Sequence, residues 1–301
     1  MIKLTKNTKG ILLALSAALA VSNVYIFSKA ALNEVHLAQF GFYWFGLGIL
    51  WNLAYIFAFG KYRKFSAITA KSFKALFVIA VLEMVGTLFF FMSIKTLSNP
   101  AVVSFIANIN PLFVTAMGII LLKERFNFIE FFGMGILLIG TIIISLKGSG
   151  NIDTIFIPGV QYILLSGFIF SIATILAKRQ ILYVDASFLA LSRILLLFIF
   201  SFVTLQVLEL SIFIPLPAFK NIAIGSILGP FLTATLGYLA LNYIEVSKAS
   251  MVRSIRSLFV LIGAYIYFGS LPGLWQIIGG LFTIIGVILI SLGKLKLKKS
   301  S

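Results

Sequence analysis

The sequence predicts an all-α integral membrane protein of ten transmembrane helices, arranged as two inverted five-helix repeats with both termini in the cytoplasm. Of the 301 residues, 61% are hydrophobic and only 11% are charged, and the mean hydropathy is +1.12. A soluble domain has about 45–50% apolar and about 25% charged residues. This chain therefore has more apolar surface than a soluble core of its length could bury, which indicates that lipid is its solvent.

Ten apolar runs are long enough to cross a bilayer, which takes about 20 residues of helix. The runs are continuous and do not alternate as β-strands of a membrane barrel would, and a helix pairs its own backbone groups within lipid. The first run follows Lys3, Lys6 and Lys9 like a secretory signal, but no cleavage site and polar domain come after it, so we expect it to be retained. We expect spans at 10–29, 38–59, 74–95, 100–122, 127–147, 157–178, 187–212, 221–244, 249–268 and 272–292.

The basic residues lie mainly in every second gap between these spans. With the N-terminus inside, 17 of the 24 lysines and arginines fall on the cytoplasmic side, four fall on the opposite side, and three lie within spans. This bias follows the positive-inside rule. It predicts a multi-pass protein of the cell inner membrane, and it assigns the net charge of +16 to loops and not to a nucleic-acid surface.

The two halves of the chain, 1–150 and 151–301, resemble each other at fixed spacings. Residue pairs 149 positions apart include Lys29 and Lys178, Trp44 and Arg193, and Ser98 and Ser247. Beyond a three-residue gap in the ninth span the spacing becomes 146, where GTIIISL (Gly140–Leu146) corresponds to GVILISL (Gly286–Leu292). Because five spans is an odd number, the second half enters the membrane from the opposite side, which makes an inverted repeat.

Inverted repeats with a site at their interface are a recurring design of secondary transporters. The alternative is a duplication that built only a larger membrane scaffold. The chain has few side chains that could serve in catalysis or bind a metal, because it contains no cysteine, one histidine (His36) and eight carboxylates. No nucleotide-binding glycine motif joins a strand to a helix, so we expect no ATP coupling, no metal and no other cofactor.

Two stretches resemble the drug/metabolite transporter superfamily, in particular its EamA-type members. Asn99–Phe126 resembles the fourth helix of that family and the turn after it, and Ser250–Pro272 resembles the ninth. In one branch the ninth helix carries an Arg-Tyr-x-Glu-Leu-like motif, whose Arg matches Arg253 while Ser254 and Arg256 depart from it. The resemblance covers nearly the whole chain and implies two five-helix repeats. It also implies a substrate such as S-adenosylmethionine or an amino acid, without choosing between them. The matching residues are Asn110, Pro111, Leu112, Phe113, Glu124 and Arg125.

Four charged residues lie away from the ends of the predicted spans: Glu83, Arg193, Arg253 and Arg256. A charge at the centre of a span costs about 2.5–3.5 kcal/mol on insertion scales, so it usually faces the protein interior or a wet cavity. Arg253 and Arg256 are three residues apart and share a helix face, where two guanidinium groups would clamp a carboxylate or phosphate. Alternatively, the arginines snorkel to the headgroups. Glu83 either pairs with an arginine or titrates as a proton-coupling carboxylate.

Polar and helix-breaking residues complete the predicted site. Such polar side chains either line a substrate path or bond from helix to helix, and Pro111 and Pro230 mark either gates or ordinary kinks in membrane helices. The aromatic run Phe89–Phe91 covers every face of its helix, which favours lipid contact and core over a substrate cage. The predicted substrate-binding residues are Glu83, Asn108, Asn110, Arg193, Tyr238, Asn242, Arg253 and Arg256.

Together these features predict a secondary transporter, not an enzyme, that moves a small polar metabolite bearing a carboxylate or phosphate across the inner membrane by alternating access. Its partners would be that substrate, the lipid bilayer and, as a candidate coupling ion, the proton; the oligomeric state is left open. An exporter of drugs or hydrophobic cations is the alternative, and it would need an acidic cavity. A membrane-embedded lipid-modifying enzyme is a third hypothesis, which the scarcity of acids and histidines disfavours.

Overall fold

The computed structural model describes residues 5–62, 69–122, 127–145 and 157–297, and these parts contain helices and no strand. The helices of the first half are α1 (Lys6–Leu32), α2 (Leu37–Ala58), α3 (Ala70–Thr96), α4 (Pro100–Ile106), η2 (Ala107–Ile109), α5 (Asn110–Leu122) and α6 (Phe128–Ser145). Those of the second half are α7 (Val160–Gln180), α8 (Ala186–Val207), α9 (Leu216–Ser226), η4 (Ile227–Thr233), α10 (Ala234–Leu241), α11 (Val246–Arg253), α12 (Arg256–Phe268) and α13 (Leu274–Leu297).

Eight helical segments of the described chain are long and apolar enough to cross a membrane. Two of them, Pro100–Met117 and Leu216–Leu241, are built from several consecutive helices. Two shorter apolar helices, Arg256–Phe268 and Leu274–Ile290, occupy the places of the ninth and tenth expected spans. The ninth is short because the chain breaks between α11 and α12. The chain is thus a multi-pass, all-helical membrane protein, while the count of ten spans stays a prediction.

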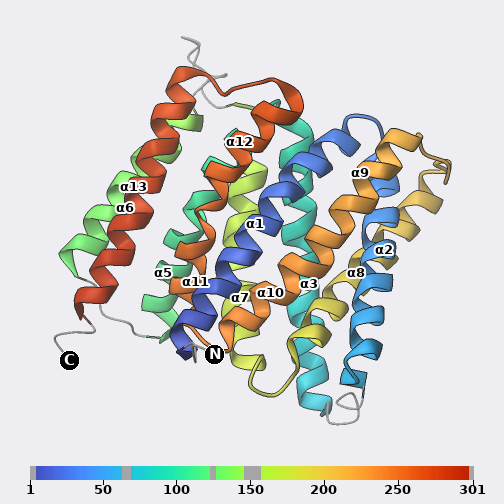
Figure 1. Ribbon diagram of the computed structural model, residues 1–301, viewed down its shortest axis with the longest axis horizontal. Helices are drawn as coiled ribbons and strands as arrows, with labels where there is room; N and C mark the ends of the chain where they lie inside the picture. The colour runs from blue at the N-terminus through green and yellow to red at the C-terminus, as the bar shows by residue number, and fades with distance from the viewer. Residues whose placement is uncertain (1–4, 63–68, 123–126, 146–156, 298–301) are drawn as a thin grey trace.

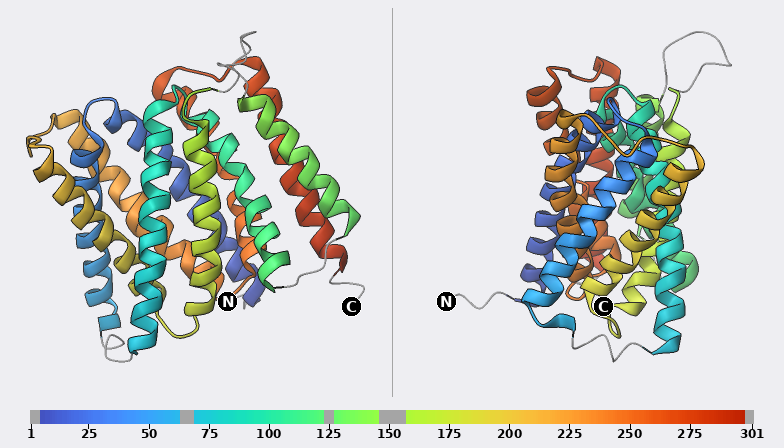
Figure 2. Two further views of the ribbon diagram at one scale, coloured as in Figure 1. Left: turned by 180° about the vertical axis from the view of Figure 1, so that it is seen from behind. Right: turned by 90° about the vertical axis from the view of Figure 1, so that its right-hand side faces the viewer.

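The helices form one bundle in which the two halves run in opposite directions (Figures 1 and 2). Helix α1 starts at the end of the bundle where α13 finishes, and α7, which is equivalent to α1, starts at the other end. The pair α6 and α13 lies at one side of the bundle, and the pair α2 and α8 lies at the other. The opposed directions of α1 and α7 are those of an inverted repeat.

The helix contacts themselves obey a two-fold relation between the halves. Helix α3 packs on α7, and its counterpart α10 packs on α1; α5 packs on α7, and α11 and α12 pack on α1. The contacts between α2 and α8 and between α6 and α13 join equivalent helices. The first helix of each half is therefore packed by equivalent helices of the chain, in the same arrangement on both sides.

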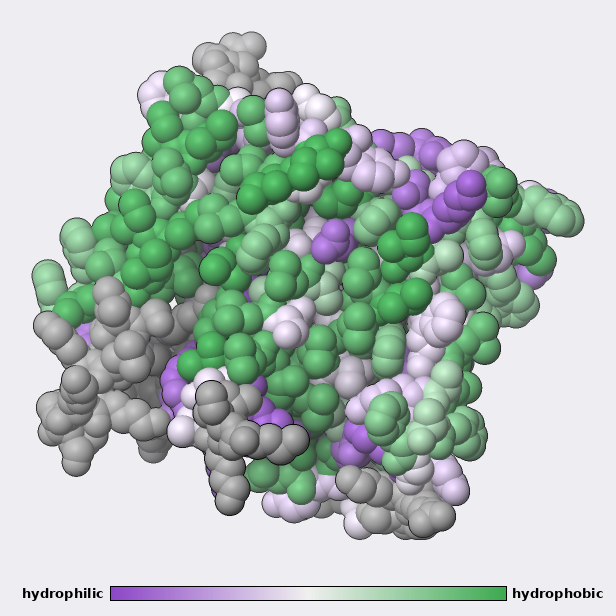
Figure 3. Space-filling view, in the orientation of Figure 1, coloured by the Kyte–Doolittle hydropathy of each residue, from purple (hydrophilic) through white to green (hydrophobic). Residues whose placement is uncertain are grey.

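The face of the bundle seen in Figure 3 is mostly apolar, with a few hydrophilic patches. Phe128 is 81% exposed and Ile266 is 78% exposed, and many other large hydrophobic side chains point outward. Apolar patches of this extent are rare on monomeric soluble proteins. The bilayer covers them here, so polar groups must satisfy one another inside the bundle.

Glycines hold α6 and α13 at backbone contact. A Cβ atom on Gly140 would lie 2.6 Å from the carbonyl oxygen of Gly279, and one on Gly133 would lie 2.9 Å from that of Gly286. The contact is isologous, since Gly133 and Gly140 correspond to Gly279 and Gly286 at the spacing of 146. Small residues allow this close approach in membranes, where helices associate by packing and not by the hydrophobic effect.

Gly140→Val should separate α6 from α13 and lower the free energy of unfolding by about 1–3 kcal/mol, the usual cost of overpacking. The clash is with the Gly279 carbonyl and with the backbone nitrogen of Thr283, which cannot rotate away as a side chain could. Gly135→Val is the matched control on the same helix, because a Cβ atom on Gly135 would meet nothing within 4 Å. Equal thermal stability of the two purified variants would contradict this packing.

Two equivalent lysines cap the ends of equivalent helices. Lys29 on α1 donates to the carbonyl of Leu97 at 2.8 Å and to that of Lys95 at 3.2 Å, at the C-terminal end of α3. Lys178 on α7 donates to the carbonyl of Ile244 at 3.0 Å and to that of Leu241, at the C-terminal end of α10. A cation is favourable there because unpaired carbonyls give the helix end partial negative charge.

Lys29→Met keeps the apolar stem but leaves the two carbonyls without their donor. We expect a loss of about 1–3 kcal/mol in the free energy of unfolding, the usual cost of an unsatisfied buried acceptor. Lys220→Met, at an exposed position of α9, serves as the control. A thermal midpoint of Lys29→Met that matches the control would show that the cap is energetically neutral.

Candidate functional site

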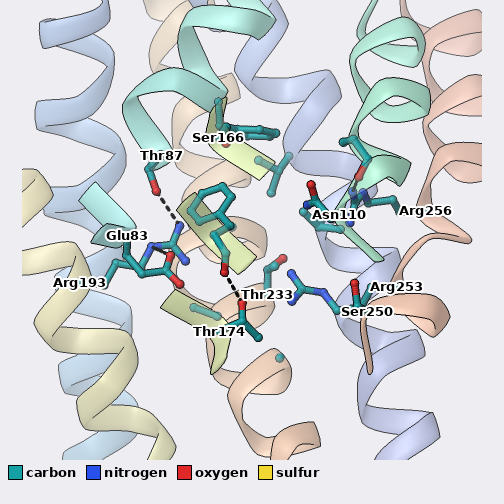
Figure 4. Close-up of a pocket in the computed structure, with 18 of the residues that line it drawn as sticks. Glu83, Thr87, Asn110, Ser166, Thr174, Arg193, Thr233, Ser250, Arg253 and Arg256 are labelled. Carbon is teal, nitrogen blue, oxygen red and sulfur yellow. Dashed lines mark hydrogen bonds and ion pairs between the residues drawn. The ribbon is translucent and has the colours of Figure 1, made fainter. Parts of the chain in front are cut away.

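A cavity of about 150 Å³ lies in the middle of the bundle, between the two halves (Figure 4). Its walls come from α1, α2, α3, η2 and α5 of the first half and from α7, α8, η4, α10, α11 and α12 of the second. The glycine-packed pair of α6 and α13 contributes no lining residue. The cavity therefore sits where any movement of one half against the other would change its shape.

Two helices are interrupted beside the cavity, at equivalent points. In the first half the segment changes to a 3₁₀ turn at Ala107–Ile109 between α4 and α5. In the second half the chain makes a turn at Ser254 and Ile255 between α11 and α12. The continuous spans expected at 100–122 and 249–268 are therefore each broken in two. Interrupted helices at membrane depth are tolerated where they line a cavity or are buried in protein.

Pro111 explains the first interruption. Proline has no N–H, so Pro111 cannot donate to the carbonyl of Ala107, its partner in a regular α-helix. That carbonyl accepts instead from the backbone of Asn110 and from Nη2 of Arg256 at 3.0 Å. Pro111 does not line the cavity. Its effect is to free an acceptor that an arginine of the opposite half uses.

Equivalent residues meet where the two broken helices cross. Ala107 and Arg256 are 149 positions apart, as are Asn108 and Ser257. Nδ2 of Asn108 lies 3.0 Å from Oγ of Ser257 and 3.2 Å from Oγ1 of Thr283. Asn108 is fully buried and outside the cavity, so it bonds from helix to helix, which was the alternative to substrate contact.

Pro230 lies in a π-helical turn, η4, that lines the cavity. The backbone N–H of Ala234 donates to the carbonyl of Gly229, five residues back, and not to that of Pro230, its partner in a regular α-helix. Nδ2 of Asn52, in the C-terminal half of α2, donates to the carbonyl of Pro230 at 3.3 Å. Single π-turns often occur at functional sites, and this one widens the backbone beside the cavity.

One wall of the cavity carries a neutralised pair of charges. Nε of Arg193 on α8 lies 3.4 Å from Oε2 of Glu83 on α3. The hydroxyl of Tyr238 donates to Oε1 of Glu83 at 3.2 Å, and Nη2 of Arg193 donates to Oγ1 of Thr87 at 3.4 Å. Glu83 therefore pairs with an arginine, one of the two fates considered for it from the sequence.

The opposite wall carries two arginines without a carboxylate. The side chains of Arg253 and Arg256 reach the cavity from α11 and α12 (Figure 4). The Nε atoms of both are buried and have no hydrogen-bond partner among the described residues. With Arg193 and Glu83 paired, the charged lining residues leave an excess of two positive charges.

A buried amide stands beside these arginines. Oδ1 of Asn110 is buried without a hydrogen-bond partner in the described structure, and it lies against Gly167, where a Cβ would come within 2.3 Å of it. Ser166, Thr174, Thr233 and Ser250 add further polar groups to the lining. The cavity can thus offer charged donors and several hydroxyls to one small molecule.

Most of the predicted site residues meet at this cavity. Asn242, at the C-terminal end of α10, is exposed and does not reach it, and Asn108 and Pro111 lie behind its wall. Phe90 and Phe91 also line it, while Phe91 is part of the buried core, as was expected of that run. Trp44, an aromatic residue that the sequence allowed either in an interfacial belt or in a lining, lies in the lining, and Tyr25 was not predicted there. Their only sequence signal was an aromatic side chain on a span, which most spans share. The predicted residues that line the cavity are Glu83, Asn110, Arg193, Pro230, Tyr238, Arg253 and Arg256.

Comparisons with known proteins agree with this architecture. A solved crystal structure of another protein aligns with 96% of this chain and 98% of its own, with a TM-score of 0.68 and 16% sequence identity, which shows a shared fold. No curated protein matches the sequence. The EamA-like transporter family matches twice, over residues 8–146 and 157–292, once in each repeat. The chain therefore belongs to the EamA-like transporter family of small-molecule membrane transporters.

Proposed function

We propose that this chain is a secondary transporter that carries a small metabolite bearing a carboxylate or phosphate across the inner membrane by alternating access. The substrate anion binds between Arg253 and Arg256, and Asn110 and Tyr238 orient the rest of the molecule. The Glu83–Arg193 pair shapes the opposite wall. The protein crosses the membrane ten times, and both ends of the chain lie in the cytoplasm.

The observation that carries this proposal is the excess of positive charge in the cavity. A guanidinium group presents a fork of donors that matches the two oxygens of a carboxylate or phosphate. An unpaired charge in a buried site is costly unless a ligand supplies its partner. An amino acid or an S-adenosylmethionine-like metabolite would bring such an anion.

The inverted architecture supports alternating access. In transporters built from inverted repeats, the site lies near the midplane at the repeat interface and is formed by discontinuous helices. Here both interrupted helices cross beside the cavity, through the contacts of Ala107 with Arg256 and of Asn108 with Ser257. Because these residues are equivalent, the two halves can exchange conformations about their crossing point.

The exporter of hydrophobic cations is the competing function. It would need a cavity of net negative charge, since a buried cation must find an anionic partner. Among the residues that line the described cavity, the one carboxylate, Glu83, is already paired with Arg193. The charge balance thus favours an anionic substrate.

Uptake into vesicles tests the proposal. Purified protein in liposomes with an imposed proton gradient is offered amino acids, organic acids and phosphate esters, together with lipophilic cations. We expect saturable accumulation of at least one anion-bearing compound and none of the cations. Accumulation of cations alone would refute the proposal, and dependence on the proton gradient would identify the coupling ion.

A further inference from the structure

We propose that the substrate joins its anionic group to a single apolar ring, because the two repeats give the cavity two chemically different faces. This inference rests on the proposed function and narrows its substrate class. The cationic face consists of Arg253 and Arg256, both from the second repeat. The aromatic face comes from the first repeat and consists of Tyr25, Trp44, Phe90 and Phe91.

The aromatic face is one connected surface drawn from α1, α2 and α3. The rings of Tyr25 and Phe90 lie 5.0 Å apart, those of Phe90 and Phe91 5.1 Å apart, and those of Phe91 and Trp44 5.8 Å apart, all in edge-to-face contact. Trp44 is held firmly, since its ring lies where a Cβ on Gly225 would be. A rigid aromatic surface that reaches a cavity offers an apolar group both burial and favourable ring contacts.

The equivalent positions show that this division is a property of the sequence and not of the fold. A perfect repeat would place the same chemistry on both sides of the cavity. At the spacing of 149, Trp44 corresponds to Arg193, Tyr25 to Thr174 and Phe91 to Ala240. The two unpaired arginines also lack counterparts, because Arg253 corresponds to Ser104 and Arg256 to Ala107. The difference between the two faces therefore comes from positions at which the two repeats carry different residues.

The size of the cavity limits the apolar group. At about 150 Å³ it has the volume of a cavity that accepts one benzene molecule. A single ring with a short link to its anion matches that space. Phe170, from α7 of the second repeat, is a further aromatic side chain in the lining, outside the connected aromatic face of the first repeat.

Equilibrium binding to the purified full-length protein tests the inference with two matched pairs of probes: phenylacetate with acetate, and phenyl phosphate with methyl phosphate. We expect the ring-bearing member to bind at least about tenfold more tightly, the affinity gained when a Phe-sized group is buried. Trp44→Ala should reduce that ratio towards one. Trp275→Ala is the control, because Trp275 is 71% exposed and lies outside the cavity.

Fluorescence provides a second measurement that does not remove Trp44. In Trp51→Phe/Trp275→Phe, Trp44 is the one remaining tryptophan, and phenylacetate should change its emission where acetate does not. Equal affinities within both pairs, with anions still bound, would overturn the inference and leave the proposed function intact. Absence of anion binding by all four probes, with lipophilic cations bound instead, would overturn both.

Discussion

Replacing Arg253 with glutamine should lower the transport of an anionic substrate by about 10- to 100-fold, the loss expected when a hydrogen bond to a charged group is removed. The side chain of Arg253 lines the cavity, and its Nε has no hydrogen-bond partner among the described residues. The variant therefore removes a proposed ligand for the substrate without breaking a hydrogen bond or an ion pair among the described residues. Initial rates of uptake into liposomes, measured across substrate concentrations, should show the loss in apparent affinity.

Two variants frame that result. Arg179→Gln alters an exposed arginine in the last turn of α7 and should leave uptake at the level of the unmodified protein. Arg253→Lys keeps the charge but not the planar fork, so its uptake should lie between that of Arg253→Gln and that of Arg179→Gln. Arg256→Ala should also abolish uptake, but it removes the bond to Ala107 as well, which makes Arg253 the cleaner position. Undiminished uptake by Arg253→Gln would remove this residue from the site.

Replacing Glu83 with alanine should destabilise the protein by about 3–5 kcal/mol, because breaking a buried ion pair from one side leaves an uncompensated charge. The side chain of Glu83 is 7% exposed, and that of its partner Arg193 is 19% exposed, so we expect a value near the lower limit. Tyr238 also loses its acceptor in this variant. Thermal or denaturant unfolding of the purified variant measures the loss.

A double-mutant cycle separates the pair from its surroundings. If Glu83 stabilises the fold by its interaction with Arg193, then Glu83→Ala/Arg193→Ala should lose less free energy of unfolding than the two single variants lose together. Additive losses would show that the two charges do not interact. Glu83→Gln adds a test of proton coupling, since it removes the titratable group and keeps an acceptor for Tyr238; proton-independent uptake in this variant would assign the coupling role to Glu83.

The sequence predicted the all-helical membrane class, and it singled out four charged residues that line one cavity, for identifiable reasons. The insertion cost of a charge is high enough that Glu83, Arg193, Arg253 and Arg256 had to find a polar interior, and all four line the cavity. The spacing of 149 identified the repeats because equivalent helices retain equivalent roles, as Lys29 and Lys178 do at the ends of α3 and α10.

The details of the broken helices could not be predicted. Pro111 signalled a break, but the 3₁₀ turn precedes it because the freed acceptor is the Ala107 carbonyl, four residues back. The turn at Ser254 and Ile255 contains no proline or glycine that would indicate it in the sequence. Asn242 and Asn108 matched the pattern of lining residues. Asn242 lies at the exposed end of α10, however, and Asn108 bonds to Ser257 where two helices cross. Which face of an apolar helix meets a cavity depends on tertiary packing.

The electrostatic character of the cavity is the central claim, and it can be measured without knowing the substrate. The chain has no native cysteine, so Ser250→Cys places a single thiol in the cavity lining, close to Arg253 in Figure 4. Its rates of modification by an anionic and by a cationic methanethiosulfonate are compared with those of Ser211→Cys, at an exposed position. Two uncompensated guanidinium groups should favour the anionic reagent about tenfold or more relative to that control. Equal rates, or faster reaction with the cation, would contradict an anion-binding cavity.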